Sequence, residues 1–307
     1  MTRWGVVATI LAPTLDVLRF AAYHLDAGAH RLFIYLDDPE SDAYALLKAH
    51  PKIRVHQCND AHWKKLGGKR PVKHQVRQSK NATHAYNRKT DVDWLIHIDV
   101  DEFIVSQADI GTTLYKLDEQ TLCARLRPME QLVGDGQTFK GFIPNGPSRN
   151  AIVKDIYPEF GEYIKGGFLS HVAGKVFIRT GLEDVNIRIH NVFQGEVTNP
   201  QQVKLPTMDL AHCHAKPWED WLESFRYRLN HGSYRAELSA AKKDGLSLNT
   251  LLTSLEASEG KAGLRRFYDE VAVDTPALQD RLKGHNLLRE INLDLDAKLA
   301  RHFTDLT

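Results

Sequence analysis

Short apolar runs alternate with longer amphipathic segments over the first hundred residues. The apolar runs have the length of buried strands and lie at 5–11, 31–36, 53–58 and 94–98. Helical patterns fill the intervals between them, at 15–27, 43–50 and 72–89. Strands that alternate with helices predict an α/β fold, with a mostly parallel, Rossmann-like sheet flanked by helices. Ligands of such folds bind at the carboxyl ends of the strands.

The pattern changes twice further along the chain. From residue 106 short strands alternate with glycine and proline, and after Pro217 the sequence turns helical, with a dense leucine pattern over 278–303. We therefore expect one domain over 1–235, with halves at 1–105 and 106–235. Residues 236–307 are expected to form a helical C-terminal extension that packs on this domain or on a partner.

Three acids follow the fourth apolar run, in Trp-Leu-Ile-His-Ile-Asp-Val-Asp-Glu-Phe at 94–103. In an extended chain Asp99 and Asp101 point to the same side while Val100 points to the other. Two carboxylates on one side repel each other unless a cation or a donor lies between them, and oxygen ligands at an open strand end suit Mg²⁺ or Mn²⁺. The stretch predicts a divalent metal site; the alternative is that polar residues simply end a core strand.

Basic residues are concentrated just before that stretch. Residues 61–90 contain nine lysines and arginines and no acid, although the whole chain carries a formal net charge of only +1. Five of the basic side chains recur at helical spacing, which would align them in one stripe: Lys73, Arg77, Lys80, His84 and Arg88. We expect the other side of this helix to pack on a core and the stripe to bind an anion. An ordinary solvated helix face is the alternative.

A divalent metal beside a bank of arginine and lysine side chains forms a receptor for a diphosphate, because the two kinds of cation neutralise opposite faces of the same group. The expected ligand is therefore a nucleoside diphosphate. Nucleic acid is disfavoured as a partner, since the basic region is short, aromatic residues are sparse in it and the overall charge gives no long-range attraction for a polyanion.

Composition and cysteine usage indicate an ordinary globular protein. The chain has 307 residues with 42% hydrophobic content, and no apolar run is long enough for a transmembrane helix. The N-terminal apolar run is short and lacks a cleavage site for a signal peptidase. The three cysteines are scattered and odd in number, which indicates a reducing compartment and argues against a zinc framework. We expect a cytoplasmic protein, with peripheral contact to the inner face of the membrane left open.

The order of these pieces resembles the GT-A glycosyltransferases, in particular the family 2-like group whose members carry a His-Ile-Asp-Val-Asp-Glu-Phe stretch. The resemblance covers residues 4–235. The matching pieces are Tyr23-His24, Gly28, Tyr35, Asp38, Arg77-Gln78, Asn81, Ala85-Tyr86, Gly174-Lys175, Arg179, His212, Lys216 and Trp218. One piece is missing, because Leu11-Ala12-Pro13-Thr14 stands where the group usually has a Lys-Asn-Glu type tripeptide. The contacts that this tripeptide makes in relatives therefore cannot be carried over.

The resemblance implies a metal-dependent glycosyltransferase of the inverting kind. Such an enzyme moves a sugar from a nucleotide-sugar donor to a saccharide, a glycolipid or another hydroxyl acceptor, in the synthesis of surface polysaccharide or glycoconjugate. Residues 1–105 would be its nucleotide-binding half and 106–235 its acceptor-side half. The metal would be Mn²⁺ or Mg²⁺, bound by Asp99, Asp101 and His212, with His214 as the less favoured third ligand.

The resemblance and the residue patterns together give the remaining candidate site residues. Donor-binding residues would be Asp38, Lys73, Arg77, Gln78, Asp99, Lys175 and Lys216. Catalytic residues would be Asp101, Glu102 and His171. His171 and Lys175 lie in a Gly-rich stretch that could approach a ligand closely, and a turn with solvated polar groups is the alternative there. The acceptor hydroxyl also needs a general base, for which the sequence offers Asp155, Glu159, Glu162 and Asp184 without a mark that discriminates among them. Trp218 and Trp221 could stack on a sugar ring, but their helical spacing favours a place in the core.

Three other classes of protein share parts of this pattern. A nucleotidyltransferase that acts on sugar phosphates has the same need for metal and diphosphate binding. A phosphohydrolase of the haloacid-dehalogenase type also places Asp-x-Asp after an apolar strand, but there the strand comes first and a small hydroxyl-rich turn follows, where this chain has Glu102-Phe103. A non-catalytic module that binds nucleotide or carbohydrate is the third alternative.

Overall fold

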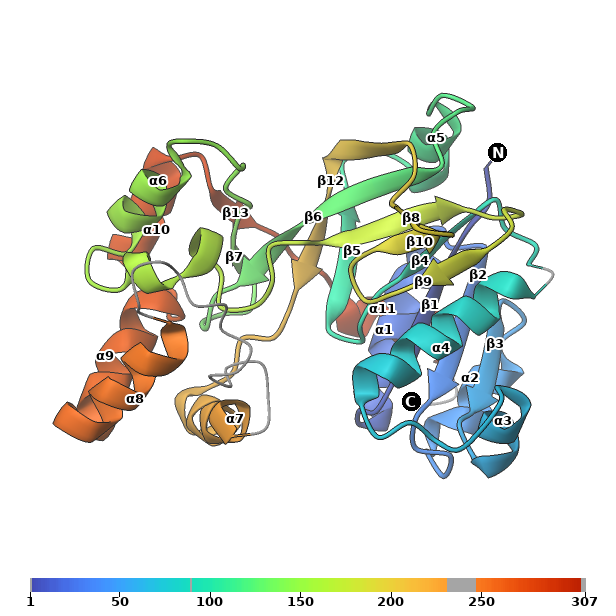
Figure 1. Cartoon of the computed structure of the whole chain (residues 1–307), viewed down its shortest axis with the longest axis horizontal. Coiled ribbons are helices and arrows are strands. Elements are labelled where there is room, and N and C mark those ends of the chain that lie inside the picture. Colours follow the sequence, from blue (N-terminus) through green and yellow to red (C-terminus); the bar gives the residue numbers. More distant parts are fainter. Residues whose placement is uncertain (1, 89, 231–246, 305–307) are drawn as a thin grey trace. The chain divides into compact units, whose positions relative to one another are not determined.

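The chain folds into two compact units, each assembled from separate stretches of sequence (Figure 1). The computed structural model describes residues 2–88, 90–230 and 247–304, with the backbone alone at 227–230. Unit 1 comprises residues 1–128, 173–212 and 293–307, and unit 2 comprises 129–172 and 213–292. The expected division at 105/106 falls inside a strand of unit 1, and the expected boundary at 235/236 lies outside the described residues.

Unit 1 is an α/β layer built on a mixed, mostly parallel sheet. Four parallel strands follow one another from the edge in the order β3 (Ile53–Gln57), β2 (Arg31–Leu36), β1 (Trp4–Ile10) and β4 (Trp94–His97). Beyond β4 lie β8 (Lys175–Arg179), which is antiparallel to it, and then β6 (Cys123–Gln131). The four parallel strands are those predicted from the apolar runs, so the α/β prediction is confirmed.

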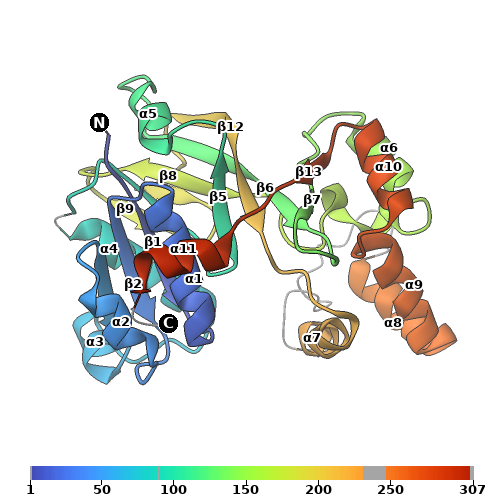
Figure 2. The ribbon, with the colours of Figure 1, turned by 180° about the vertical axis from the view of Figure 1, so that it is seen from behind.

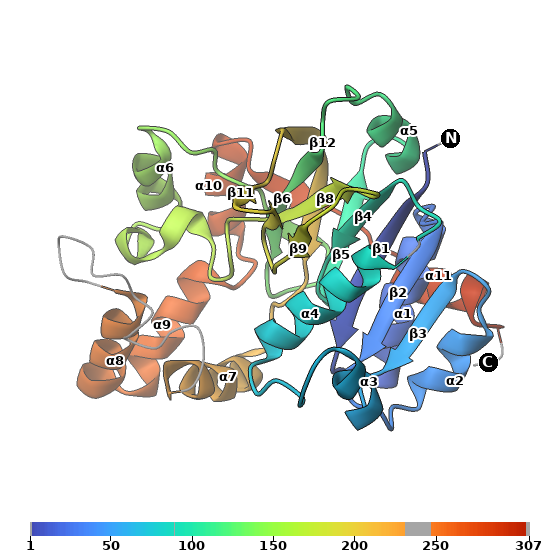
Figure 3. The same ribbon diagram turned by 45° about the vertical axis from the view of Figure 1, so that its right-hand side comes forward.

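Helices cover both faces of this sheet. Helix α4 (His74–Asn87) lies on one face, where its Ala82 and Ala85 pack with Val7 of β1 and Leu95 of β4 (Figure 3). Helix α1 (Thr14–Asp26) lies on the opposite face, and α11 (Leu295–His302) packs against α1 (Figure 2). Two shorter helices, α2 (Ala43–Ala49) and α3 (Asp60–Lys65), flank β3. The last helix of the chain therefore packs in unit 1.

Smaller elements complete unit 1. Strand β5 (Glu102–Ser106) pairs antiparallel with β12 (Gln202–His212), which places His212 opposite Glu102. Helix α5 (Ile110–Tyr115) follows β5, and Asp109 caps it by accepting a hydrogen bond from the Thr112 amide. Strands β9 (Val185–Ile187), β10 (Val192–Gln194) and β11 (Val197–Thr198) form a separate three-stranded sheet beside α4.

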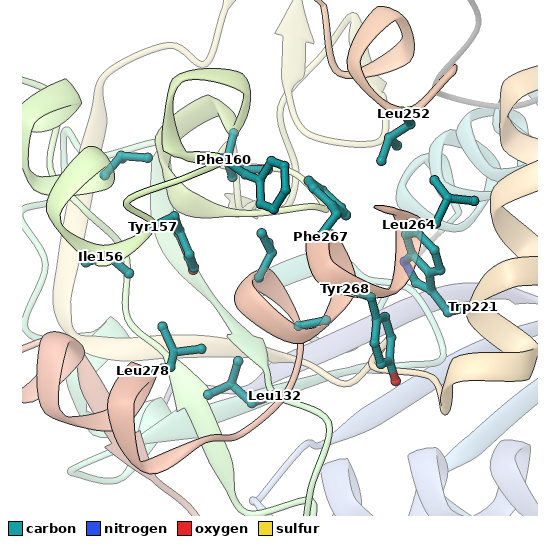
Figure 4. Packing of buried hydrophobic residues seen from close by; sticks show 14 of the residues in the cluster. Leu132, Ile156, Tyr157, Phe160, Trp221, Leu252, Leu264, Phe267, Tyr268 and Leu278 are labelled. Atoms are coloured by element: carbon teal, nitrogen blue, oxygen red, sulfur yellow. The ribbon is translucent and has the colours of Figure 1, made fainter. Parts of the chain in front are cut away.

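Unit 2 is mainly helical and has its own apolar core (Figure 4). Its strands are the end of β6, β7 (Thr138–Lys140) and β13 (Leu288–Glu290). Its helices are α6 (Arg149–Ile156), the 3₁₀ turns Gly161–Tyr163 and Lys165–Gly167, α7 (Trp218–Asn230), α8 (Leu248–Glu259), α9 (Lys261–Val271) and α10 (Pro276–Gly284). Trp221, Phe225 and Phe267 are buried together. The core place expected for Trp221 is confirmed.

Two expectations for the C-terminal region need correction. Residues 278–303 are not one helical stretch, because α10 ends at Gly284 and β13 and a turn precede α11. Asn286 and Asp294 in this interval have positive φ angles, which a continuing right-handed helix does not allow. Residues 236–307 are also not one appendage, since their last part packs in unit 1 and the rest in unit 2. No helix in the described ranges is long and apolar enough to cross a membrane.

Candidate functional site

The acids at 99–102 lie in and just after a tight turn at the carboxyl end of β4. The strand ends at His97, residues 100 and 101 form the turn, and β5 begins at Glu102. The Glu102 amide donates to the Asp99 carbonyl at 3.1 Å, and the Glu102 carboxylate accepts from the Asp99 amide at 2.8 Å. The alternation of an extended strand therefore does not apply here, and Asp99 and Asp101 have different surroundings.

Asp99 is neutralised by a lysine from β8. Its Oδ2 lies 2.7 Å from Lys175 Nζ, and its Oδ1 accepts a hydrogen bond from Gln78 Nε2 on α4. Lys175 Nζ also lies 3.2 Å from Glu102 Oε2, and the side chains of Lys175 and Glu102 are fully buried. Burial disfavours the charged carboxylate of Asp99, but Lys175 outweighs it and holds the pKa of Asp99 well below its usual range. Burial likewise opposes the charge of Lys175, yet Asp99 and Glu102 raise its pKa to about 12.

This arrangement changes the roles expected for three residues. Lys175 was expected to bind the donor, but it is buried as the counter-ion of Asp99 and Glu102. Glu102 was expected to be catalytic, but its carboxylate is bound to Lys175 and to the backbone of the turn. Gln78 was expected to contact the donor, and it donates to Asp99 instead. Long-range contacts across the sheet, which sequence spacing does not reveal, determine all three positions.

Asp101 and His212 form the more open part of the site. Asp101 Oδ2 lies 3.5 Å from His212 Nε2, and the Asp101 side chain keeps 39% of its surface exposed. Two ligand atoms that each bind one ion at about 2.1 Å lie roughly 3 to 3.5 Å apart at octahedral or tetrahedral angles. The pair therefore has the spacing and the donor chemistry for Mn²⁺. The expected third ligand, Asp99, lies at the same turn, but both of its oxygens are engaged.

Helix α4 turns a polar row toward the carboxyl ends of three strands. Arg77 binds Asp37 at the end of β2, Gln78 binds Asp99 after β4, and Asn81 donates to Thr9 Oγ1 of β1 at 3.1 Å. Asn81 also lies 2.8 Å from His62 Nε2 and 3.4 Å from Cys58 Sγ. All three of these side chains are buried, and each satisfies a polar group at the strand ends. The row fixes the edge of the sheet where ligands of α/β folds bind.

Asp37 is the centre of a basic cluster at the end of β2. Its carboxylate is bound by Arg77 Nε at 2.9 Å and by an Arg70 nitrogen at 3.0 Å, and His74 Nδ1 lies 3.5 Å away. Burial raises the pKa of this carboxyl, but hydrogen bonds from His74 and Arg77 and the charge of the arginines bring it down to about 2. Sequence reasoning selected Asp38, which is exposed and accepts a hydrogen bond from the Glu40 amide at 3.0 Å.

The expected cationic stripe on this helix is wrong at its centre. Arg77 is only 6% exposed, and its remaining donors bind the carbonyls of Pro71 and Val72. It therefore holds the loop before α4 and has no donor left for a diphosphate. Lys73 and Lys80 are exposed, as expected, and Lys73 lies at the N-terminus of α4. A buried arginine and an exposed lysine look the same in a charge pattern.

A fully buried histidine stands directly before the turn. His97 is 3% exposed, and burial together with the charge of Lys175 lowers its pKa to about 4. The imidazole therefore stays neutral at physiological pH.

Gly174 directly precedes Lys175 and has a positive φ of 68°, and a Cβ atom there would meet the Leu126 carbonyl oxygen at 2.0 Å. Only glycine fits this position, which brings the start of β8 against β6.

Most of the other expected site residues belong to unit 2. Lys216 Nζ donates to Ser224 Oγ at 3.0 Å, and half-buried His171 follows the 3₁₀ turns. His214 Nε2 lies 3.6 Å from Glu130, which forms a buried ion pair with Lys140 at 2.6 Å. Three of the four candidate bases are paired at the surface: Asp155 with His285, Glu159 with Arg266, and Glu162 with Lys154. The fourth, Asp184, is exposed in unit 1 with a positive φ of 56°.

Comparisons with known proteins add little to this geometry. No protein-family model and no curated protein matches the chain. The crystal structure of HddC from Yersinia pseudotuberculosis is 13% identical over 58% of this chain and 77% of its own, with a TM-score of 0.32. The crystal structure of a mycobacterial protein is 12% identical over 71% of this chain and 70% of its own, with a TM-score of 0.36. Similarities this distant carry no argument about function.

Proposed function

We propose that this protein is a metal-dependent glycosyltransferase of the GT-A kind, which transfers a sugar from a nucleotide-sugar donor to a hydroxyl of a saccharide or glycolipid in the cytoplasm. The observation that carries the proposal is the pair of Asp101 and His212 at the carboxyl edge of the sheet, 3.5 Å apart and open to solvent on the Asp101 side. A carboxylate and an imidazole that meet at the end of a parallel strand suit Mn²⁺. The edge is where an α/β sheet binds nucleotides.

The proposed reaction develops negative charge on the departing diphosphate and positive charge on the sugar carbon. A bound Mn²⁺ or Mg²⁺ supplies neutralisation of the diphosphate. Asp101 and His212 would hold this ion, and exposed Lys73 at the N-terminus of α4 would contribute a further positive charge. Asp99, Lys175 and Glu102 would keep the turn in place, since their charged groups are already bound to each other.

The acids around the turn also explain why a metal would be needed. Lys175 is one cation against the carboxylates of Asp99 and Glu102, so the buried cluster carries a net negative charge when all three are ionised. Asp101 adds another carboxylate at the surface of the same turn. A diphosphate is repelled by such a site unless a divalent cation binds with it. The proposal therefore predicts that metal and nucleotide bind together.

A thermal-shift panel of UDP, GDP, CDP and CMP with and without Mn²⁺ tests this function. A ligand at 100 times its Kd stabilises the folded state by about 2.7 kcal/mol. We expect at least one nucleoside diphosphate to raise Tm with Mn²⁺ and not with EDTA. Chromatography of a reaction with the matching sugar nucleotide should then show release of a nucleoside diphosphate. Equal stabilisation with EDTA would refute the metal site, and formation of a sugar nucleotide from a sugar phosphate would favour a nucleotidyltransferase.

A further inference from the structure

A groove runs along the outer side of α4 in unit 1, away from the polar row that faces the strand ends. It has a volume of about 800 Å³, which falls in the range of roughly 300 to 1,000 Å³ typical of ligand sites. One wall is the exposed face of α4, from Gln75 to Asn87, and the other comprises residues 186–191, from the end of β9 to the start of β10. None of the residues assigned to the metal or the donor lines it.

Hydrogen bonds between the two walls fix the width of the groove. Thr83 Oγ1 of α4 accepts from the Ile187 amide at 3.0 Å and lies 3.5 Å from the Ile187 carbonyl oxygen. Tyr86 of the same helix donates to the Arg179 carbonyl at 2.7 Å and accepts from the Leu182 amide at 3.1 Å. The second wall is therefore attached to α4 at Ile187, and Tyr86 attaches the connection from β8 to β9 to the same helix.

A buried arginine makes the second wall rigid. Arg125 of β6 is 5% exposed and donates to the carbonyls of Ala173 and His190, to Asn191 Oδ1 and to Gln202 Oε1, at 2.7 to 3.0 Å. Four of its five N–H donors are thus used, two on His190 and Asn191 of this wall and two on Ala173 and Gln202 outside it. An ordinary surface loop does not need a buried arginine to hold its backbone. The hydrogen bonds of Arg125 therefore indicate that the positions of residues 188–191 are important.

Most of the accessible surface of the groove is apolar, its polar lining groups are positive or neutral, and no acid is among the described residues that line it. Its cations are Lys80 on the α4 wall and Arg188 on the opposite wall, where the Arg188 guanidinium lies 4.4 Å from the Phe193 ring centre. Carboxamides and hydroxyls from both walls complete the polar lining: Gln75, Ser79, Asn87 and Asn186. Apolar surface from Leu66, Val76 and Ile189 lies between them. Burial and the nearby Arg88 lower the pKa of His84, so its imidazole adds no charge.

We propose that this groove binds an acidic saccharide, with Lys80 and Arg188 on its carboxylate or phosphate groups. Carboxamides both donate and accept, which matches sugar hydroxyls, and the apolar patches match the C–H faces of the rings. Arginine and lysine on opposite walls match an anionic substituent between them. The proposal rests on the groove alone and does not depend on the glycosyltransferase activity.

Titration calorimetry of the full chain, without nucleotide or metal, tests this proposal. The probes are trigalacturonate, its fully methyl-esterified form, a phosphorylated maltotriose, inorganic phosphate and a hexaglutamate peptide. We expect one of the two acidic trisaccharides to bind at least tenfold more tightly than the ester, the phosphate and the peptide, and the better of the two identifies the anionic group. Equal binding of the ester, or tighter binding of the peptide or of phosphate, would overturn the proposal, and so would the absence of binding by both acidic trisaccharides.

Variants locate the binding on the protein. Lys80→Ala and Arg188→Gln should each weaken the better trisaccharide at least fivefold, and Lys80→Glu should weaken it further, because it places an acid against the ligand. Lys116→Ala removes an exposed lysine at the end of α5 and should change nothing. Lys80 is exposed, so its variants should fold even if Arg188→Gln does not. If Lys80→Glu bound the trisaccharide with unchanged affinity, the ligand would bind elsewhere on the protein and the proposed site would be refuted.

Discussion

Lys175 Nζ lies 2.7 Å from Asp99 Oδ2, although the two residues are 76 positions apart in the chain. The contact joins the start of β8 to the turn after β4, and Glu102 makes the lysine a partner of a second carboxylate at 3.2 Å. A buried cation between two acids is stable only while all three are present, because a buried charge without a partner is costly. The turn that carries Asp101 depends on this lysine.

Lys175→Met should therefore destabilise unit 1 by about 3 to 5 kcal/mol at pH 7.5. The pKa values of Asp99 and Glu102 should rise in the variant, so the folded state would bind more protons than the unfolded state between pH 4.5 and 7.5. Its deficit relative to the wild type should then shrink as pH falls through this window. Urea unfolding at pH 4.5 and at pH 7.5 measures the difference in unfolding free energy between the variant and the wild type, with Lys116→Met as the surface control. A deficit that does not change with pH would show that the carboxylates are not coupled to Lys175.

Asp101→Asn and His212→Ala test the proposed metal pair. Each removes one of the two side chains that meet 3.5 Å apart, so each should weaken Mn²⁺-dependent nucleotide binding and reduce turnover about 10²-fold or more. Calorimetry with and without EDTA, at unchanged Tm of the free protein, measures the effect. His30→Ala, at an exposed position beside Asp91, is the matched control. Metal-dependent binding that survives in both site variants would place the ion elsewhere.

Arg77→Ala tests the pair at the end of β2. We expect a loss of about 3 to 5 kcal/mol, because the carboxylate of Asp37 is left buried without its main partner. A double-mutant cycle with Asp37→Asn should give a coupling energy of about 1 to 3 kcal/mol. Urea unfolding of the four proteins measures it. Additive losses would mean that Arg77 acts only through the carbonyls of Pro71 and Val72 and not through Asp37.

Buried histidines should make the fold less stable in mild acid. Burial lowers the pKa of His24 to about 4, while an unfolded chain protonates histidine near 6.5. The unfolded state therefore binds the extra proton first, and stability should fall as pH drops from about 6.5 to 4. His24 alone should lower the unfolding free energy by up to about 3 kcal/mol over this window.

His24→Phe isolates that contribution. The variant should lose part of the slope of unfolding free energy against pH between 6.5 and 4, whatever its absolute stability. The ring at this position stacks on Phe103 at 5.9 Å, so phenylalanine keeps an aromatic contact. His30→Phe, at an exposed position, should leave the slope as it is. The same slope in His24→Phe and in the wild type would assign the acid sensitivity to other groups.

The strands and their acids could be predicted because the information is local. An apolar run of four or five residues that ends in Asp-x-Asp predicts a buried strand with polar groups at its end, and β4 with its turn has this form. The choice among those acids could not be made in the same way. Asp99 and Asp101 have the same chemistry in the sequence, and only the approach of β8 gives Asp99 a buried lysine as its partner, with 27% of its side chain exposed against 39% for Asp101.

The sequence pattern placed Ala82, Tyr86, Lys73 and Lys80 of α4 on the correct sides of the helix but Arg77 on the wrong one. Charge at helical spacing predicted an exposed stripe through Arg77, but the buried side of the helix contains Arg77, Gln78 and Asn81. The burial of these polar side chains is compensated because they bind polar groups at the carboxyl ends of three strands. Which groups lie there depends on the order of the strands in the sheet. These three polar side chains give no apolar signal, so hydrophobic periodicity, which correctly placed Ala82 and Tyr86 on the core side, could not reveal them.

The two units are interleaved along the chain, because unit 1 contains the residues before 129 and those after 292 as well as a middle segment. No single cut in the polypeptide can release either unit whole. A fragment that stops after α7 would lack α11, and the face of α1 that α11 covers would meet water. Separate expression of unit 1 would therefore require a circular permutation or a linker in place of each unit 2 insertion. Ribosomal synthesis meets the same constraint, since unit 1 can be completed only when the last helix has left the exit tunnel.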